Sequence, residues 1–210
     1  MERVIVVDRD PGCAAGGIRD PRLRLEVAEW SEWLDAGLDR VGPGAHLVPY
    51  HWAPHLLLGW LEGQLRRAGA ATARGGPAAP RGLPFDAATA RGDRALSYAA
   101  WACPPACIEP ALCPHTRGPR DWSLAADLEA PGPDAETHGH VVFRCLHLLY
   151  GVGTIPVAAI LEARDRLRAG LARGRQRYRI ATSSHCHGLA TLLEVAPAAA
   201  ADAGGGTLAG

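Results

Sequence analysis

Short apolar runs alternate with amphipathic stretches over the first seventy residues. Val4 to Val7 is a continuous β-branched run, which predicts a buried strand. Leu23, Leu25 and Val27 alternate with polar neighbours and predict a second strand. Apolar residues at three- or four-residue spacing predict two helices, and a third strand lies between them. The expected elements are strands at 4–7, 23–27 and 46–50, a helix from Trp30, and a helix from Pro54 through Leu65.

The pattern is interrupted in the middle of the chain and then resumes. From 69 to 82 the residues are mainly Ala, Gly, Pro and Arg without periodicity, which predicts an exposed loop or linker. Further strands are predicted at 97–102, 141–149 and 178–182, with a helix at 156–171. Beyond Val195 the Ala- and Gly-rich sequence predicts a disordered tail.

The order of these elements favours an α/β fold with an open, mostly parallel sheet and flanking helices. In such a sheet the carboxyl ends of the strands form the edge where ligands bind. Several residues with chemical potential come directly after a predicted strand, so we expect them to share one crevice. They are Asp8, Asp10, His51, Cys103, Gly151, Gly153 and the tripeptide at 185–187.

The run Val4-Ile5-Val6-Val7-Asp8-Arg9-Asp10-Pro11 resembles the second strand and acidic end of a Rossmann-type, TrkA-N-like NAD-binding domain. The resemblance covers residues 1–70 and implies that Asp8 and Asp10 accept hydrogen bonds from the ribose of NAD(P). The first strand and the G-x-G-x-x-G phosphate-binding turn are missing, because Met1 stands where the second strand begins. Either the coding sequence starts further upstream or the domain has lost its nucleotide. Asp after a strand also commonly caps a turn.

These observations together predict four sections of the chain. They are a Rossmann-like part at 1–68, a loop or linker at 69–94, a Cys- and His-rich α/β part at 95–195 and a disordered tail at 196–210.

Three of the six cysteines lie within one proline-rich segment. Cys103, Cys107 and Cys113 have the spacing C-x3-C-x5-C, and four prolines between 103 and 115 predict a rigid loop. Thiolates are soft ligands for zinc and iron–sulfur clusters, and a stiff loop can hold three of them close together. The alternative is that the three are small buried hydrophobic residues, because free Cys is among the most buried residue types.

The segment His185-Cys186-His187 is the first candidate for a fourth ligand. It follows a predicted strand, and Gly188 allows its backbone to approach a bound group closely. Cys145 and His147 are alternatives, because they lie two apart on one predicted strand and face the same side. Core packing is the other interpretation of that pair. His51 and His55 have the spacing of a zinc pair, but the predicted helix starts only at Pro54, which makes this pair weak.

The segment Gly151-Val152-Gly153-Thr154 is predicted to connect a strand to a helix. Free N–H groups and the helix dipole at such a turn can bind a phosphate or carboxylate, so Gly151, Gly153 and Thr154 are candidate anion-binding residues. A simple connection without ligand is the other interpretation.

Composition narrows the function classes. The chain has 22 basic and 22 acidic residues, and all of the basic ones are Arg. A balanced charge does not favour sequence-independent binding to nucleic acid or to an anionic membrane. No apolar run reaches the roughly 18 residues that a membrane span needs, which predicts a cytoplasmic protein with reduced thiols.

The sequence therefore predicts a cytoplasmic protein that binds zinc or an iron–sulfur cluster and has a redox or accessory role. The alternative is a degenerate nucleotide-binding module that regulates or contacts a protein partner or a second copy of itself. In that case the helix with Trp30 and Trp33 would face the other subunit.

Overall fold

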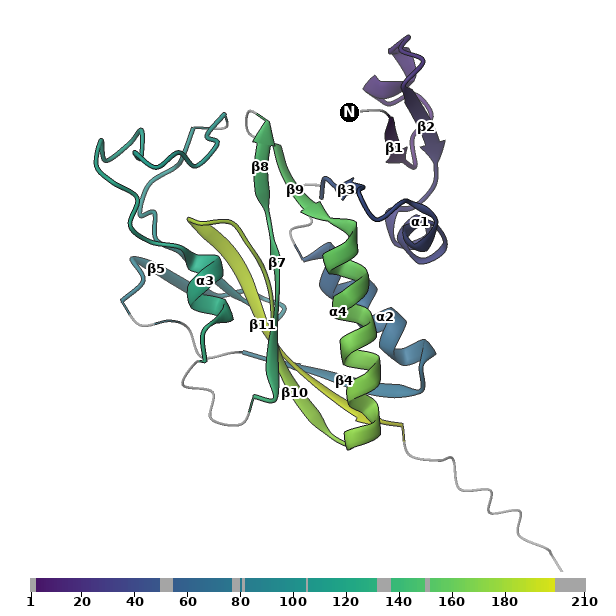
Figure 1. Ribbon diagram of the computed structural model, residues 1–210, viewed down its shortest axis with the longest axis vertical. Helices are drawn as coiled ribbons and strands as arrows, with labels where there is room; N and C mark the ends of the chain where they lie inside the picture. The colour runs from purple at the N-terminus through teal and green to yellow at the C-terminus, as the bar shows by residue number, and fades with distance from the viewer. Residues whose placement is uncertain are drawn as a thin grey trace, which may run out of the picture.

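A six-stranded mixed sheet forms the centre of the molecule in the computed structural model (Figure 1). The structure describes residues 3–49, 55–76, 80, 82–104, 106–131, 137–149 and 152–198. The strand order is β5 (Phe85–Ala88), β6 (Arg94–Ser97), β11 (His187–Pro197), β10 (Gln176–Ser183), β7 (Gly139–Arg144). A further strand, β4 (Ala70–Gly75), pairs with the second half of β11. Only the pair β7–β10 is parallel; the other pairs in this sheet are antiparallel.

The predicted fold class, an open and mostly parallel Rossmann-like sheet, is wrong. The main cause is a hairpin: β10 and β11 are neighbours in the chain and pair antiparallel from Ser183–Gly188 to Gln176–Val195. Gly188 permits this close approach, because a Cβ there would meet the Ser183 hydroxyl oxygen at 2.7 Å. Strand β11 was not among the predicted elements, although Leu193 and Val195 on it are buried in the core.

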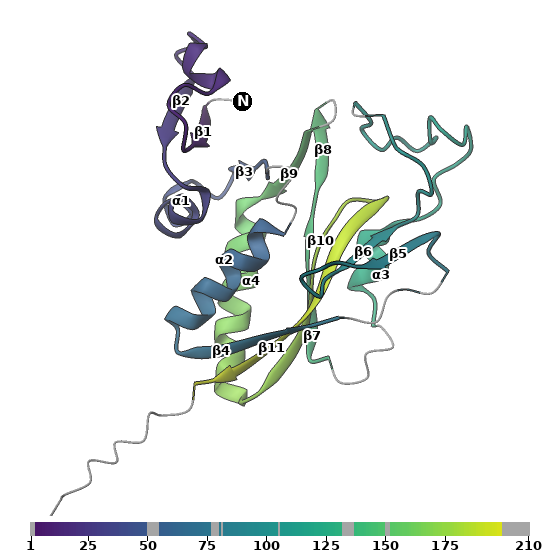
Figure 2. The same cartoon turned by 180° about the vertical axis from the view of Figure 1, so that it is seen from behind.

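Helices cover both faces of the sheet (Figures 1 and 2). The longer helices α2 (Leu56–Arg67) and α4 (Val157–Gly170) pack on one face, and α3 (Leu124–Glu129) packs on the other. Strand alternation separates the two cores: Ile180 belongs to the α2/α4 side and the adjacent Ala181 to the α3 side. The larger core is therefore under α2 and α4.

Two smaller sheets complete the fold. In one, β9 (Val152–Pro156) lies between β3 (His46–Leu47) and β8 (Leu146–Leu149), and both pairings are antiparallel. In the other, β1 (Val4–Asp8) pairs in parallel with β2 (Leu23–Val27), followed by α1 (Trp30–Gly37). Short 3-10 segments lie at Ala14–Gly17, Leu38–Arg40 and Leu171–Arg173.

Most of the predicted strands and helices are present, with some changes of boundary. The predicted strands at 4–7 and 23–27 and the helix from Trp30 are confirmed. The strand predicted at 141–149 is divided at Cys145 into β7 and β8. After this residue the chain no longer pairs with β10 and enters the β8–β9 hairpin. The strand predicted at 97–102 instead ends at Ser97. The segment 69–94, predicted to be a loop, contains β4 and β5.

Some predictions fall outside the described residues, among them those for His51, Pro54, Gly151 and the tail beyond 198. In the part of the chain that the structure describes, no helix combines the length and the apolar character that crossing a bilayer requires.

Candidate functional site

The turn between β10 and β11 is the structural centre of the candidate site. It carries Ser184, His185 and Cys186, and it closes with a hydrogen bond from the Ser184 N–H to the His187 carbonyl (2.9 Å). The loop that connects β6 to α3 packs against it: the Tyr98 N–H donates to the Cys186 carbonyl and the Leu124 N–H to the His185 carbonyl. Both ends of the cysteine-bearing loop are thereby fixed to the hairpin turn.

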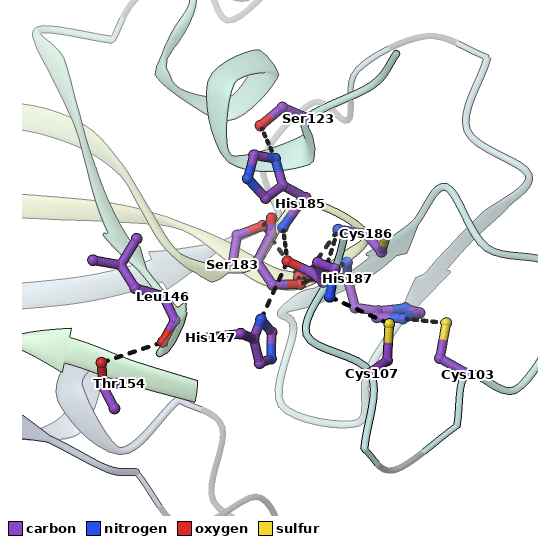
Figure 3. Close-up of polar contacts among 12 residues, drawn as sticks. Cys103, Cys107, Ser123, Leu146, His147, Thr154, Ser183, His185, Cys186 and His187 are labelled. Carbon is purple, nitrogen blue, oxygen red and sulfur yellow. Dashed lines mark hydrogen bonds and ion pairs between the residues drawn. The ribbon is translucent and has the colours of Figure 1, made fainter. Parts of the chain in front are cut away.

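Four thiols meet where this loop contacts the turn. Cys103, Cys107 and Cys113 from the loop and Cys186 from the turn line one cavity of about 10 Å³. Figure 3 shows the Cys103 and Cys107 side chains pointing from the loop toward the segment that carries Cys186 and His187. The sequence stretches 103–113 and 185–187, about seventy residues apart in the chain, thus come together at one cavity. No cysteine of the chain is in a disulfide, and all six are described.

Backbone N–H groups are directed at two of these sulfurs. The Glu109 N–H donates to the Cys107 Sγ at 3.4 Å. A tight turn follows Cys113: the Arg117 N–H donates to the Cys113 carbonyl, the Cys113 N–H to the Gly118 carbonyl, and Arg117 has a left-handed φ of 58°. Hydrogen bonds from the Thr116 backbone, opposed by partial burial, lower the pKa of the Cys113 thiol. Such N–H···S contacts favour the thiolate, which is the form that binds metals.

Burial is the largest influence on the other two thiols. Burial raises the pKa of Cys186 to about 11, and burial together with the neighbouring Cys107 raises the pKa of Cys103. The Trp122 indole N–H contacts the Cys186 Sγ at 3.4 Å. A cation placed among these sulfurs would compensate for both burial and mutual repulsion.

Glu109 connects the cysteine loop to the turn. Its carboxylate accepts hydrogen bonds from the Ser184 hydroxyl (2.6 Å) and from the N–H groups of His185 (3.0 Å) and Cys186 (3.1 Å). The His147 Nδ1 lies 3.3 Å from the same carboxylate. Burial alone would raise the pKa of Glu109, but these donors bring it below its ordinary value. The side chain is 7% exposed, so it is an ionised carboxylate inside the protein.

The two histidines of the turn point in different directions. The His185 Nδ1 contacts the hydroxyl of Ser123, which is the N-cap of α3 (Figure 3). The His187 Nδ1 contacts the Ser97 Oγ at 2.9 Å, and its Nε2 faces the Cys103 Sγ at 3.4 Å. Because Ser97 already donates to the Ala99 carbonyl, it accepts from Nδ1–H, which leaves the Nε2 lone pair toward Cys103. Of the two histidines, only His187 is at the thiols.

The remaining candidate ligand and anion-binding residues that the structure describes do not line the thiol cavity. Cys145 and His147 both pack over Gly153, so they do share a side, but they are separated from the thiol cavity by Glu109. Gly153 and Thr154 are inside strand β9 rather than in a turn before a helix, which corrects the expected anion-binding connection. The Thr154 hydroxyl donates to the Leu146 carbonyl and contacts His46.

The acidic residues near the N-terminus cap their own turn. The Asp10 N–H donates to the Asp8 carboxylate and the Gly12 N–H to the Asp10 carboxylate. The Trp30 indole N–H donates to the Val7 carbonyl in β1, and the Trp33 indole N–H donates to the Glu26 carboxylate in β2. This end of the molecule is far along the chain from the thiols and shares none of their contacts among the described residues.

Several residues of the site could not be identified from the sequence. Glu109 lies between two of the cysteines, which was the available signal, but only the folded loop directs it at the turn. Ser97 and Trp122 have no sequence signal at all, and Ser184 is marked in the sequence only by its position beside His185. Within the described ranges, no three His, Cys, Asp or Glu side chains already stand close enough together to hold a metal ion.

Comparison with known proteins identifies the family. The model of the family AF_1314_C, described as "Uncharacterized protein, C-terminal domain", matches residues 57–196, and the chain belongs to this family. The matched segment begins in α2 and ends in β11, so it includes the whole thiol cavity. No curated protein and no solved structure matches the chain.

Proposed function

We propose that this protein is a metal-binding protein in which Cys103, Cys107, Cys113 and Cys186 together hold one zinc ion. The observation that carries the proposal is the convergence of these four thiols on one small cavity, three from a proline-stiffened loop and one from a hairpin turn. Four thiolates are one of the usual ligand sets of a structural zinc ion. Binding requires the thiols to close around the ion from their present positions.

The size of the cavity favours a single ion over a cluster. A volume of about 10 Å³ is close to that of one water-sized sphere. An iron–sulfur cluster contains several iron and sulfide ions, so it would require the loop to move outward. Zinc is the better match, and the cluster that the sequence equally predicted is the second candidate.

The proposed role is accessory rather than catalytic. Four protein thiolates leave no open coordination position for a substrate, and Zn²⁺ itself has no redox chemistry. The ion would supply a cross-link between a loop with little regular structure and the sheet. A reducing cytoplasm, which we propose as the location, suits four unpaired thiols.

The nucleotide-binding alternative has less support. The hydroxyls of a ribose would have to replace the backbone N–H groups that now donate hydrogen bonds to the Asp8 and Asp10 carboxylates. We therefore propose metal binding and not NAD(P) binding as the function.

Elemental analysis of protein purified without oxygen tests the proposal. We expect about one zinc per chain, and we expect Cys107→Ser to lose it because three thiolates bind zinc far more weakly than four. Cys13→Ser is the matched control, since Cys13 lies in the N-terminal part and lines no part of the cavity; it should keep the zinc. Wild-type protein that neither contains nor takes up zinc would contradict the proposal. Stoichiometric iron and sulfide together with visible absorption would contradict zinc and identify the metal centre as an iron–sulfur cluster.

A further inference from the structure

The contacts of Glu109 place it between the first three thiols and the fourth. Its backbone N–H donates to the Cys107 Sγ, while its side chain reaches the turn that carries Cys186. Its φ of 52° is left-handed, which costs energy for a residue with a Cβ. The loop therefore takes a strained conformation at the residue whose carboxylate contacts the turn.

The carboxylate is the acceptor for three donors of the turn. Three donors from three consecutive residues, Ser184, His185 and Cys186, point at its two oxygens. A turn with two N–H groups directed inward needs an acceptor, because an unpaired buried donor is costly. Glu109 supplies it from a segment that is seventy-five residues or more distant in the chain.

We infer that Glu109 is a positioning residue for the metal centre: it fixes the backbone of Cys186 so that this thiol completes the ligand set. The inference rests on the proposed function. Glu109 itself is not a ligand, because its oxygens are already occupied by the turn and by His147. The Trp122 indole N–H donates to the Cys186 sulfur itself, at 3.4 Å.

The chemistry of the contact makes Glu109→Gln a sharp substitution. Gln has almost the same shape, but one of its two oxygens is replaced by an NH₂ group that can only donate. The Ser184 hydroxyl can reverse its role, whereas the N–H groups of His185 and Cys186 cannot. If the NH₂ group replaces Oε1, the Cys186 N–H loses its Glu109 acceptor, and if it replaces Oε2, the His185 N–H does. In either case one of the two peptide groups that lead into Cys186 is no longer held by Glu109.

Cobalt substitution measures the consequence directly. Co²⁺ in place of zinc gives sulfur-to-metal absorption that grows with the number of thiolate ligands. We expect the absorption of four thiolates in the wild type and about three quarters of that intensity in Glu109→Gln. We also expect Glu109→Gln to bind zinc roughly 10- to 100-fold more weakly, as when other groups that orient a ligand are removed. Glu129→Gln, on the surface of α3 with its side chain 44% exposed, is the matched control and should behave as wild type.

A double-mutant cycle separates positioning of Cys186 from general damage. If Glu109 acts through Cys186, Glu109→Gln should add almost nothing to the loss already caused by Cys186→Ser. Ser184→Ala removes the hydroxyl that donates to Glu109 and that accepts from the Cys186 and His187 N–H groups at 3.3 Å, so it should shift the cobalt spectrum in the same direction. That variant also provides the answer if Glu109→Gln does not fold.

The failures of the two proposals are distinguishable. Wild-type protein that binds neither cobalt nor zinc would contradict the metal centre itself. A wild-type metal centre combined with an unchanged four-thiolate spectrum in both Glu109→Gln and Ser184→Ala would contradict only the role of Glu109. Fully additive losses in the cycle would do the same.

Discussion

The region under α2 and α4 and the region around the thiol cavity are held together in different ways. Under the helices, apolar side chains such as Leu61, Ile160 and Ile180 are completely buried against one another. Around the cavity, the loop from 98 to 123 has little regular structure, and hydrogen bonds to the β10–β11 turn fix its position.

This difference shows which interactions each region depends on. Apolar packing is spread over many contacts and tolerates local change, although each deletion costs stability. The thiol region depends on a few polar contacts, with Glu109 at their centre, so single substitutions there should change the chemistry more than the fold. Three further predictions test how separate the two regions are.

The largest effect is expected in the apolar region. Leu61→Ala removes a side chain that is fully buried, and it should lower the free energy of unfolding by roughly 2–5 kcal/mol. Denaturant unfolding measures this change. Leu148→Ala, whose side chain is in the second sheet and 59% exposed, is the control with an expected change below about 0.5 kcal/mol. The separation of the regions fails if wild-type protein contains the proposed zinc and folded Leu61→Ala protein does not.

A smaller effect concerns the buried polar residues beside α2. The Nε2 of His55 contacts Thr191, whose hydroxyl donates to Asp93 at 2.5 Å. Burial lowers the pKa of His55 to about 4 from 6.5; Asp93 and Glu62 oppose this change and Arg74 adds to it. The unfolded chain therefore takes up a proton at a higher pH than the folded protein does.

Stability should accordingly be complete above a pH of about 6.5 and fall as the pH decreases toward about 4, by on the order of 3 kcal/mol. Urea unfolding across this range, with a chelator present so that zinc release does not contribute, measures the slope. His55→Gln should remove that part of the slope, and His46→Gln, in the exposed strand β3, should retain it. An equal slope in His55→Gln would show that other groups cause it.

The smallest effect is expected where α3 meets the β10–β11 turn. Ser123 caps α3 by accepting a hydrogen bond from the Ala126 N–H, and it also contacts His185. Ser123→Ala should cost about 1 kcal/mol of stability, and Ser123→Asp should restore the cap. Thermal or denaturant unfolding of both variants checks this. Loss of zinc from Ser123→Ala would show that His185, and not only Glu109, holds the turn.

Part of the fold was predictable because the relevant signals are local. The β-branched run at Val4, the helix that begins at Trp30 and the helix α4 follow from periodicity within a few turns of chain. The prolines between 103 and 115 exclude a regular element, and the structure has none there apart from an isolated bridge at Leu112 and Pro119, as far as the described residues show. The grouping of cysteines in that loop is likewise visible in the sequence.

Strand direction and pairing were not predictable in the same way. The order of strands and helices favoured a parallel sheet, but the pairing of β4 and β6 with β11 depends on partners that are distant in the chain. Thr154 is an example: the sequence predicts it in a turn before a helix, whereas the structure has it inside strand β9.

The sequence by itself determined which residue types are available for metal binding and that three of the thiols lie in one stiff loop. Only the tertiary structure decided that Cys186 joins them, that His185 does not, and that Glu109 faces the turn between β10 and β11. The physical reason is the range of the interactions. Backbone preferences and periodicity act between near neighbours, whereas the hydrogen bonds that assemble this site join segments that only the folded sheet brings together.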